Sequence, residues 1–218
     1  KGSVKRFLKG EKALISINNL MQKRAIGDEF YLFNIELFLE DFGFNKNCKV
    51  LFGDHHFAHA LPSLFYNPDW NEAMIYTADG GGDGIQYSFT HFSRDKLNII
   101  YGGNDSLRSE WLPDSMGQMY GITTEICGFR KNRHEGKITG LAAFGDPKYS
   151  KKIIEMYCID DNARIIPKFN SYDELRVVLQ NIFNVHGRED LAASAQEALE
   201  VLILESMQSL KNKYSFKN

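Results

Sequence analysis

The sequence has little of the features that mark several large classes of protein. Its three cysteines, Cys48, Cys127 and Cys158, are far apart and form no CxxC pair. This excludes a disulfide-rich secreted fold and predicts reduced, buried thiols in a cytoplasmic protein. Apolar runs are short and no signal peptide is present, so we expect no membrane partner. The formal net charge is -2, without a basic stripe, which argues against a nucleic-acid partner and for small molecules or proteins.

Several motifs that would identify an enzyme directly are also missing. There is no Ser-His-Asp order, no GxxxxGK[ST] phosphate loop and no GxGxxG dinucleotide turn. No low-complexity linker or internal repeat divides the chain, so residues 1–218 are treated as a single region. Because the chain begins at Lys1 rather than methionine, we expect it to be a portion of a longer protein.

The hydrophobic pattern predicts an α/β domain in which helices flank a mixed sheet. Residues 72–79, 85–92 and 97–101 are separated by glycines and turn residues, which is typical of an antiparallel meander. The other expected strands are 49–53 and 163–169, and the expected helices are 1–20 (loosely), 28–43, 57–66, 115–129, 148–158, 172–183 and 189–213.

Three of the six histidines stand within five positions, at the predicted start of helix 57–66. His55 and His59 are four residues apart, so they share one helix face, which is a known geometry for a transition metal. His56 points elsewhere in that arrangement and is the weaker candidate. Asp79 ends the next strand, where a carboxylate could join the same metal site. The alternative is a pair of histidines that cap and pack the helix start.

A glycine turn follows Asp79, made of Gly80, Gly81 and Gly82, then Asp83. Such a turn lets backbone amides approach an anion closely, as in phosphate-binding loops. A plain tight hairpin turn explains the same residues.

The segment HEGKITGLAAFGDP contains Glu135, Gly136 and Lys137 ahead of a small-residue helix start. A lysine beside glycines suits binding of phosphate or carboxylate. Glu135 is either an acid-base group or a partner of Lys137. The alternative explanation of the segment is a solvated charged loop.

Taken in order, DHHFAHA, TADGGGDG, SMGQMYGITTEICGF, HEGKITGLAAFGDP and DLAASAQEALE resemble the amino-terminal domain of the O-carbamoyltransferases, which include nodulation-factor and antibiotic-tailoring enzymes. The resemblance runs from about Val50 to the end of the chain. It implies an actin-like ATPase (ribonuclease H-like) fold, present here only in its central part. It also implies iron or another divalent metal held by His55, His59 and Asp79, and a nucleotide near Glu135, Gly136 and Lys137.

The resemblance further implies a reaction. Carbamoyl phosphate and ATP form carbamoyl-adenylate on a separate carboxy-terminal adenylate-forming domain, and the domain resembling this chain passes the carbamoyl group to a hydroxyl of a small-molecule acceptor. The family's opening hairpin and final aspartate ligand are missing, so we expect the chain alone to be inactive. The alternatives are an actin-like kinase or phosphatase and a catalytically silent nucleotide- or metal-binding module.

Overall fold

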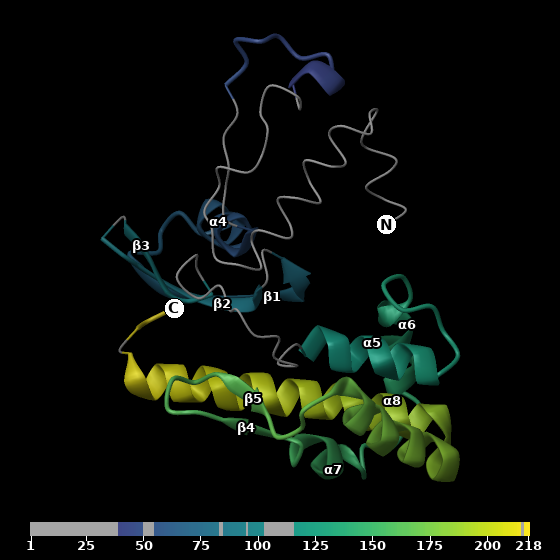
Figure 1. Cartoon of the computed structure of the whole chain (residues 1–218). Coiled ribbons are helices and arrows are strands. Elements are labelled where there is room, and N and C mark those ends of the chain that lie inside the picture. Colours follow the sequence, from purple (N-terminus) through teal and green to yellow (C-terminus); the bar gives the residue numbers. More distant parts are fainter. Residues whose placement is uncertain (1–38, 50–54, 83–84, 95, 103–115, 215) are drawn as a thin grey trace.

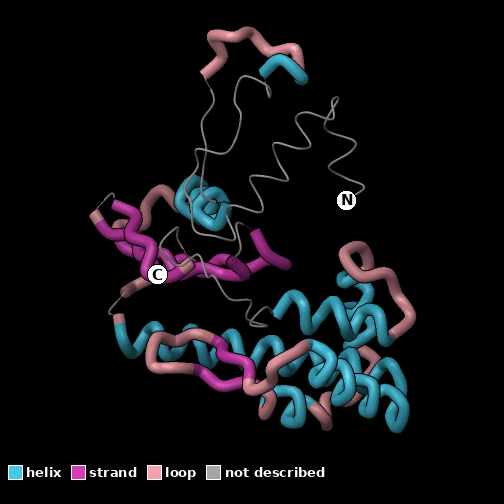
Figure 2. Tube along the Cα trace, viewed as in Figure 1, coloured by secondary structure: helices cyan, strands magenta, loops and turns pink. Residues whose placement is uncertain are grey.

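The computed structural model of the chain describes residues 39–49, 55–82, 85–94, 96–102, 116–214 and 216–218 (Figure 1). The helices are α4 (His55–Tyr66), α5 (Met116–Ile126), α6 (Glu135–Ala142), α7 (Ser150–Ile154) and α8 (Tyr172–Lys213). The strands are β1 (Glu72–Gly82), β2 (Ile85–Ser93), β3 (Lys96–Tyr101), β4 (Tyr157–Ile159) and β5 (Ile165–Pro167). A three-stranded sheet of β1, β2 and β3 carries helix α4 on one face and the end of helix α8 on the other, and α5, α6 and α7 pack along α8 (Figures 1 and 2).

The predicted meander is confirmed, because β1, β2 and β3 pair antiparallel in sequence order. Strands β4 and β5 form a second antiparallel pair. The expected mixed sheet is therefore corrected: every strand pair within the described residues is antiparallel. The reason is the short connections, since parallel neighbours need a crossover of a dozen residues or more.

Strand β1 packs on both of its faces, and alternate residues contact different hydrophobic clusters. Ala73 and Ile75 pack against Ala60 of α4, whereas Tyr76 packs on the opposite face in the cluster that contains Phe89 and Leu210 of α8. The sheet is thus held between α4 and the last turns of α8. This alternation also determines which polar residues of β1 face α4.

Helix α4 begins at His55, two residues before the predicted start, and ends at Tyr66 as predicted. Asn67 follows and its side-chain amide donates to the Ser63 carbonyl at 2.7 Å, which satisfies one of the free carbonyls at the helix end. Pro62 lies inside the helix on its exposed side. Because the helix starts early, the whole histidine cluster belongs to its first turn and a half.

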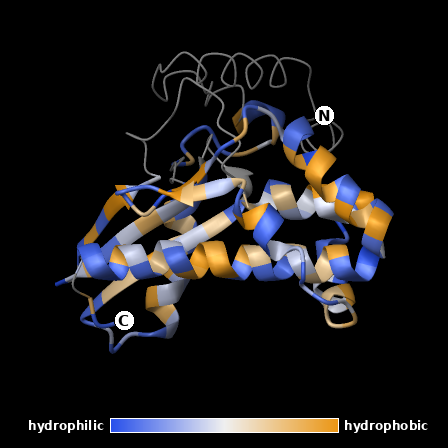
Figure 3. Ribbon diagram, turned by 90° about the horizontal axis from the view of Figure 1, so that it is seen from below, coloured by the Kyte–Doolittle hydropathy of each residue, from blue (hydrophilic) through white to orange (hydrophobic). Residues whose placement is uncertain are grey.

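The largest core lies among α5, α6, α7, β4, β5 and α8. Helix α5 is buried on most sides and ends at Ile126, close to the predicted end, and Gly128 with a φ of 83° follows two residues later. Helix α8 consists of two helical segments, because Gly187 is non-helical with φ 84°, and this agrees with the two predicted helices. Figure 3 shows hydrophilic and hydrophobic residues alternating along the long helix. Its buried residues Leu191, Ala195, Ala198 and Leu202 are three or four residues apart, as on the apolar face of an amphipathic helix.

The helix predicted over 148–158 is too long, and the predicted burial of Cys48 and Cys158 is wrong. The helix expected over 148–158 ends at Ile154, and Cys158 lies in β4. Tyr157 is 2% exposed, so burial of its ring favours the extended strand over another helical turn. All three cysteines are free, but only Cys127 is buried, while Cys48 and Cys158 are exposed.

Some predictions fall on residues outside the described ranges. They are the helix over 1–20, most of the strand over 49–53, and Asp83. Of the helix expected over 28–43, residues 39–41 are described and helical, and the chain turns at Gly43 with φ 68°. Among the described helices, none combines the length and the apolar character needed to cross a membrane.

Candidate metal centre

The first turns of α4 bring His55 and His59 to Asp79, the residue at which the predicted strand ends. His55 Nε2 lies 2.5 Å from Asp79 Oδ2, and His59 Nε2 lies 3.5 Å from the same oxygen. The two imidazole nitrogens are 3.1 Å apart. The expected contact of these three side chains is therefore present in the structure.

Two regular periodicities produce this convergence. His55 and His59 are one helical turn apart, so their rings point in the same direction from α4. Thr77 and Asp79 continue the α4-facing row of β1 that begins with Ala73 and Ile75. Packing of Ala60 against this row holds the helix start above the end of the row.

The donor set fits a transition metal. Bond lengths near 2.0–2.2 Å around one ion separate neighbouring donor atoms by about 2.9–3.5 Å, and the distances of 2.5, 3.1 and 3.5 Å lie close to that range. Two imidazoles and one carboxylate are ligands that iron and zinc accept. Three protein donors leave further positions open for water or substrate.

At the same end of the sheet, one polar atom has no hydrogen-bond partner among the described residues. Oε1 of Gln86 is buried and accepts no hydrogen bond within the described part of the chain. Thr77 pairs with Ser88 across the sheet, so Gln86, two residues before Ser88, belongs to the same face and to the end of the sheet where Asp79 lies. A buried amide oxygen without a partner indicates a place for a bound water or ligand group.

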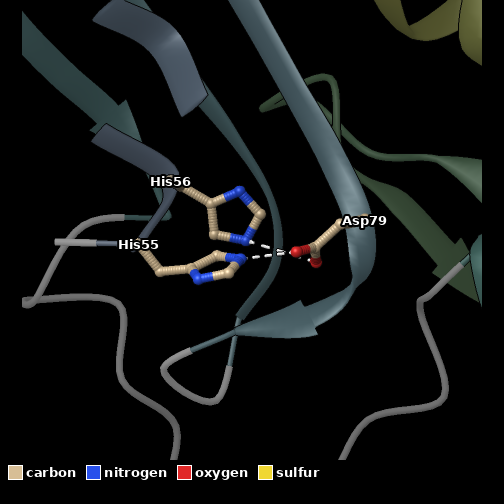
Figure 4. A group of neighbouring side chains, drawn as sticks. All are labelled: His55, His56 and Asp79. Atoms are coloured by element: carbon tan, nitrogen blue, oxygen red, sulfur yellow. Dashed lines mark hydrogen bonds and ion pairs between the residues drawn. The ribbon is translucent and has the colours of Figure 1, made fainter. Parts of the chain in front are cut away.

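His56 lies closer to the site than the sequence indicated, and the expectation that it points elsewhere is corrected. Its side chain is 1% exposed, and its Nε2 lies 4.0 Å from Asp79 Oδ1. Figure 4 shows His55 and His56 both directed at the Asp79 carboxylate. His55 and His56 are consecutive, but Asp79 lies against the start of α4, so each ring reaches a different oxygen of the same carboxylate.

The cluster is open on one side. The His59 side chain is 51% exposed and that of His55 is 37% exposed, whereas Asp79 is 27% exposed. A small molecule can therefore reach the nitrogen atoms from the side of His59, while the carboxylate stays against the sheet.

The glycine segment differs from the expected turn. Gly80, Gly81 and Gly82 belong to β1, and Gly82 pairs with Ile85 after a register shift that begins at Ala78. Such a shift is typical of a β-bulge, which glycines accommodate without steric cost. Asp83 lies outside the described residues, and the predicted anion-binding role of the segment stays a prediction.

The segment 135–137 was expected to precede a helix, and the structure corrects this expectation because the segment is itself helical. Glu135, Gly136 and Lys137 form the first turn of α6. The carboxylate of Glu135 accepts the backbone N–H of Asn132, and a first-turn acid is also favoured by the helix dipole. Among the described residues no ion pair links Glu135 to Lys137, and no hydrogen bond links this turn to the histidine cluster.

Lys137 projects from α6 over an aromatic ring. Its Nζ lies 5.2 Å from the ring centroid of Phe129. A Cβ atom added at Gly136 or at Gly140 meets nothing within 4 Å, so internal packing does not require glycine at either position. The predicted role of Lys137 and its neighbours in binding a nucleotide stays a prediction.

Local sequence patterns do not indicate all the polar residues of this region. His56 is off the helix face that His55 and His59 share, and Thr77 and Gln86 belong to no motif. The alternation of β1 could have placed Thr77 beside Asp79, whereas Gln86 required the strand register.

Comparison with known proteins identifies the family. The family described as Carbamoyltransferase N-terminus matches residues 11–218. The match begins earlier than Val50, where the resemblance became distinct in the sequence. This chain belongs to that family.

Two relatives are similar to this chain over most of its length. Nodulation protein NolNO of Sinorhizobium fredii is 30% identical over 176 residues, which cover 77% of this chain and 24% of NolNO. The uncharacterized protein MJ1051 of Methanocaldococcus jannaschii is 26% identical over 193 residues, which cover 83% of this chain and 35% of MJ1051. The chain therefore spans about a third or less of the length of these relatives.

Proposed function

We propose that the chain carries the carbamoyl-transfer part of an ATP-dependent O-carbamoyltransferase. In this reaction carbamoyl phosphate, ATP and one water molecule yield carbamoyl-adenylate, phosphate and pyrophosphate on a carboxy-terminal domain of the longer protein. The carbamoyl group then passes to a hydroxyl of a small-molecule acceptor. The observation that carries the proposal is the convergence of His55, His59 and Asp79 within 3.5 Å in a member of the carbamoyltransferase family. The proposal includes an actin-like fold for the complete domain.

The transfer step requires stabilisation of negative charge. The acceptor oxygen forms a bond to the carbamoyl carbon, the bond from that carbon to the adenylate phosphate breaks, and the electron pair leaves on AMP while the hydroxyl proton passes to solvent. A bound iron or other divalent ion would supply a positive charge for the carbonyl oxygen or the acceptor oxygen.

The residues of this chain have distinct parts in the proposal. His55, His59 and Asp79 would hold the ion, and the exposed side of His59 would admit the reacting groups. Lys137, at the first turn of α6, would contribute positive charge near the nucleotide phosphate. Gly80, Gly81 and Gly82 would let backbone amides approach an anion.

Product analysis tests the proposal without knowledge of the acceptor. The natural protein at its full length is incubated with ATP and carbamoyl phosphate, and the nucleotide products are separated. We expect AMP, pyrophosphate and inorganic phosphate, with AMP and pyrophosphate formed only when carbamoyl phosphate is present. Release of ADP would instead favour an actin-like kinase. Absence of any turnover, together with metal binding, would favour a silent metal-binding module.

A second measurement then addresses transfer itself. Carbamoyl phosphate labelled in the carbonyl carbon is supplied with a panel of sugar, polyketide and oligosaccharide hydroxyl acceptors. We expect label in one acceptor class and none in the deoxy analogue that lacks the hydroxyl.

A further inference from the structure

A series of buried polar groups leads from β2 to the Asp79 carboxylate. Ser88 Oγ and Thr77 Oγ1 are 2.7 Å apart, and Thr77 Oγ1 and His56 Nδ1 are 2.8 Å apart. His56 Nε2 then lies 4.0 Å from Asp79 Oδ1. Ser88 and His56 are each 1% exposed, and Thr77 is 7% exposed. Apolar side chains of similar size could fill this space without burying polar groups, so packing alone does not explain the series.

The hydrogens of the series can be assigned from its chemistry. When Ser88 donates to Thr77 and Thr77 donates to His56 Nδ1, the remaining hydrogen of the neutral imidazole is on Nε2. That N–H then faces the carboxylate of Asp79. The opposite direction would turn a nitrogen lone pair toward a negatively charged oxygen, which is unfavourable.

We infer that His56 is a positioning residue that fixes the orientation of the Asp79 carboxylate, and that Thr77 and Ser88 fix His56 in turn. The inference rests on the proposed metal centre. The N–H dipole of His56 attracts Oδ1, which leaves Oδ2 directed at His55 and His59. The separation of 4.0 Å exceeds a direct hydrogen bond, so His56 acts by electrostatic orientation of the carboxylate.

The role of a metal ligand fits His56 less well. His55 and His59 both lie within 3.5 Å of Oδ2, whereas His56 faces Oδ1 on the buried side of the carboxylate. If His56 bound an ion through Nε2, its proton would have to be on Nδ1. His56 would then donate to Thr77, and Thr77 to Ser88, which reverses the direction of both hydrogen bonds. The two roles differ in the number of coordinated imidazoles, which spectroscopy can count.

The experiment measures cobalt(II) binding to the metal-free, full-length natural protein. The variants are Thr77→Val, which keeps the size of the side chain and removes its hydroxyl, and His56→Gln. Thr90→Val is the matched control, because Thr90 is 0% exposed and occupies the same sheet face, and no described residue bonds its hydroxyl. His91→Gln controls for loss of a histidine, since His91 contacts Glu72 at 3.3 Å instead of the cluster.

We expect cobalt(II) affinity to fall about tenfold in Thr77→Val and about ten- to a hundredfold in His56→Gln, as for other residues that support metal ligands. Both controls should bind as the wild type does, and melting of the metal-free proteins should show that Thr77→Val is folded. If His56→Gln fails to fold, Thr77→Val by itself decides the result. Pulsed paramagnetic resonance of the copper(II)-loaded protein should count two coordinated imidazoles in the wild type and in both variants.

Other results overturn the inference in distinguishable ways. Unchanged affinity in Thr77→Val and His56→Gln, or an equal loss in Thr90→Val, would remove the positioning role. Three imidazoles in the wild type that become two in His56→Gln would make His56 a ligand. A wild type that binds neither ion would refute the metal centre itself, and the role of His56 with it, although carbamoyl phosphate-dependent AMP release would still test the proposed reaction separately.

Discussion

The sequence indicates two candidate sites, and they are built differently. One is the corner at which the start of α4, with His55 and His59, meets Asp79 of β1. The other is the first turn of α6, with Glu135 and Lys137. At the corner, side chains from separate elements meet within 3.5 Å. In the first turn of α6, the contacts of Glu135 with Asn132 and of Lys137 with Phe129 join residues that are near in sequence. Convergence of remote side chains indicates a preformed site, whereas a local turn with an open face depends on an incoming ligand.

The corner should show the larger response to a single substitution. Asp79→Asn keeps the shape of the side chain and removes the charge that the two histidines approach. We expect metal affinity and carbamoyl transfer to fall by at least about a thousandfold, beyond the 10- to 100-fold effect of outer partners. Metal content and transfer should be measured on the same preparation.

Glu72→Gln is the control for this variant. Glu72 lies at the other end of β1 and contacts His91 at 3.3 Å, so it should leave metal binding unchanged. Asp79→Asn protein that binds metal normally would contradict the proposed ligand set.

The first turn of α6 should respond in activity more than in stability. Lys137→Met keeps most of the apolar stem over Phe129 and removes the charge. We expect transfer to fall about a hundredfold, because a cation beside a developing phosphate charge is worth roughly 3 kcal/mol. The stability cost should stay within about 1 kcal/mol, the size of an exposed cation–π contact.

Lys152→Met is the matched control, since Lys152 lies 5.5 Å over the Tyr149 ring on α7. It should reproduce the small loss of stability without the loss of transfer. Equal activity of the two variants would make Lys137 an ordinary surface lysine.

Substitutions at two glycines in or just after α6, Gly140 and Gly145, distinguish an effect on packing from an effect on ligand binding. A Cβ at Gly145 would collide with the backbone of Glu189, so Gly145→Ala should destabilise the protein by about 1–3 kcal/mol. Gly140→Ala, on the open side of α6, should stabilise it by about 0.5–1 kcal/mol. Thermal melting distinguishes the two. A several-fold loss of transfer in the more stable Gly140→Ala protein would indicate that a ligand uses this side of the helix.

The smallest expected effect concerns the reactivity of the three cysteine thiols, because Cys127 is buried whereas Cys48 and Cys158 are exposed. Burial raises the pKa of Cys127 to about 11, and Glu189 adds to the shift while Arg188 opposes it. At pH 8 its reactive thiolate is therefore about a thousandth of the total. We expect a thiol reagent to modify the exposed Cys48 and Cys158 in the folded protein and Cys127 only after unfolding. Rapid modification of Cys127 would contradict its burial.

The elements with strong periodic patterns could be predicted from the sequence. The meander β1–β2–β3, the end of α5 just before Gly128 and the break in α8 near Gly187 all follow from local apolar spacing and glycine. The helix expected over 148–158 could not be separated from strand β4, because burial of Tyr157 depends on contacts with Phe169 that are not local. Glu135, Gly136 and Lys137 were expected in a loop because glycine weakens the local helix signal.

By itself the sequence determined the family and the pairing of His55 with His59, because helical spacing puts residues i and i+4 on one face. Only the tertiary structure decided that His56 faces Asp79 as well, and that Thr77 and Ser88 support it. The position of α4 on the sheet and the pairing of Thr77 with Ser88 arise from packing and strand register between distant segments, and neither is contained in any local pattern.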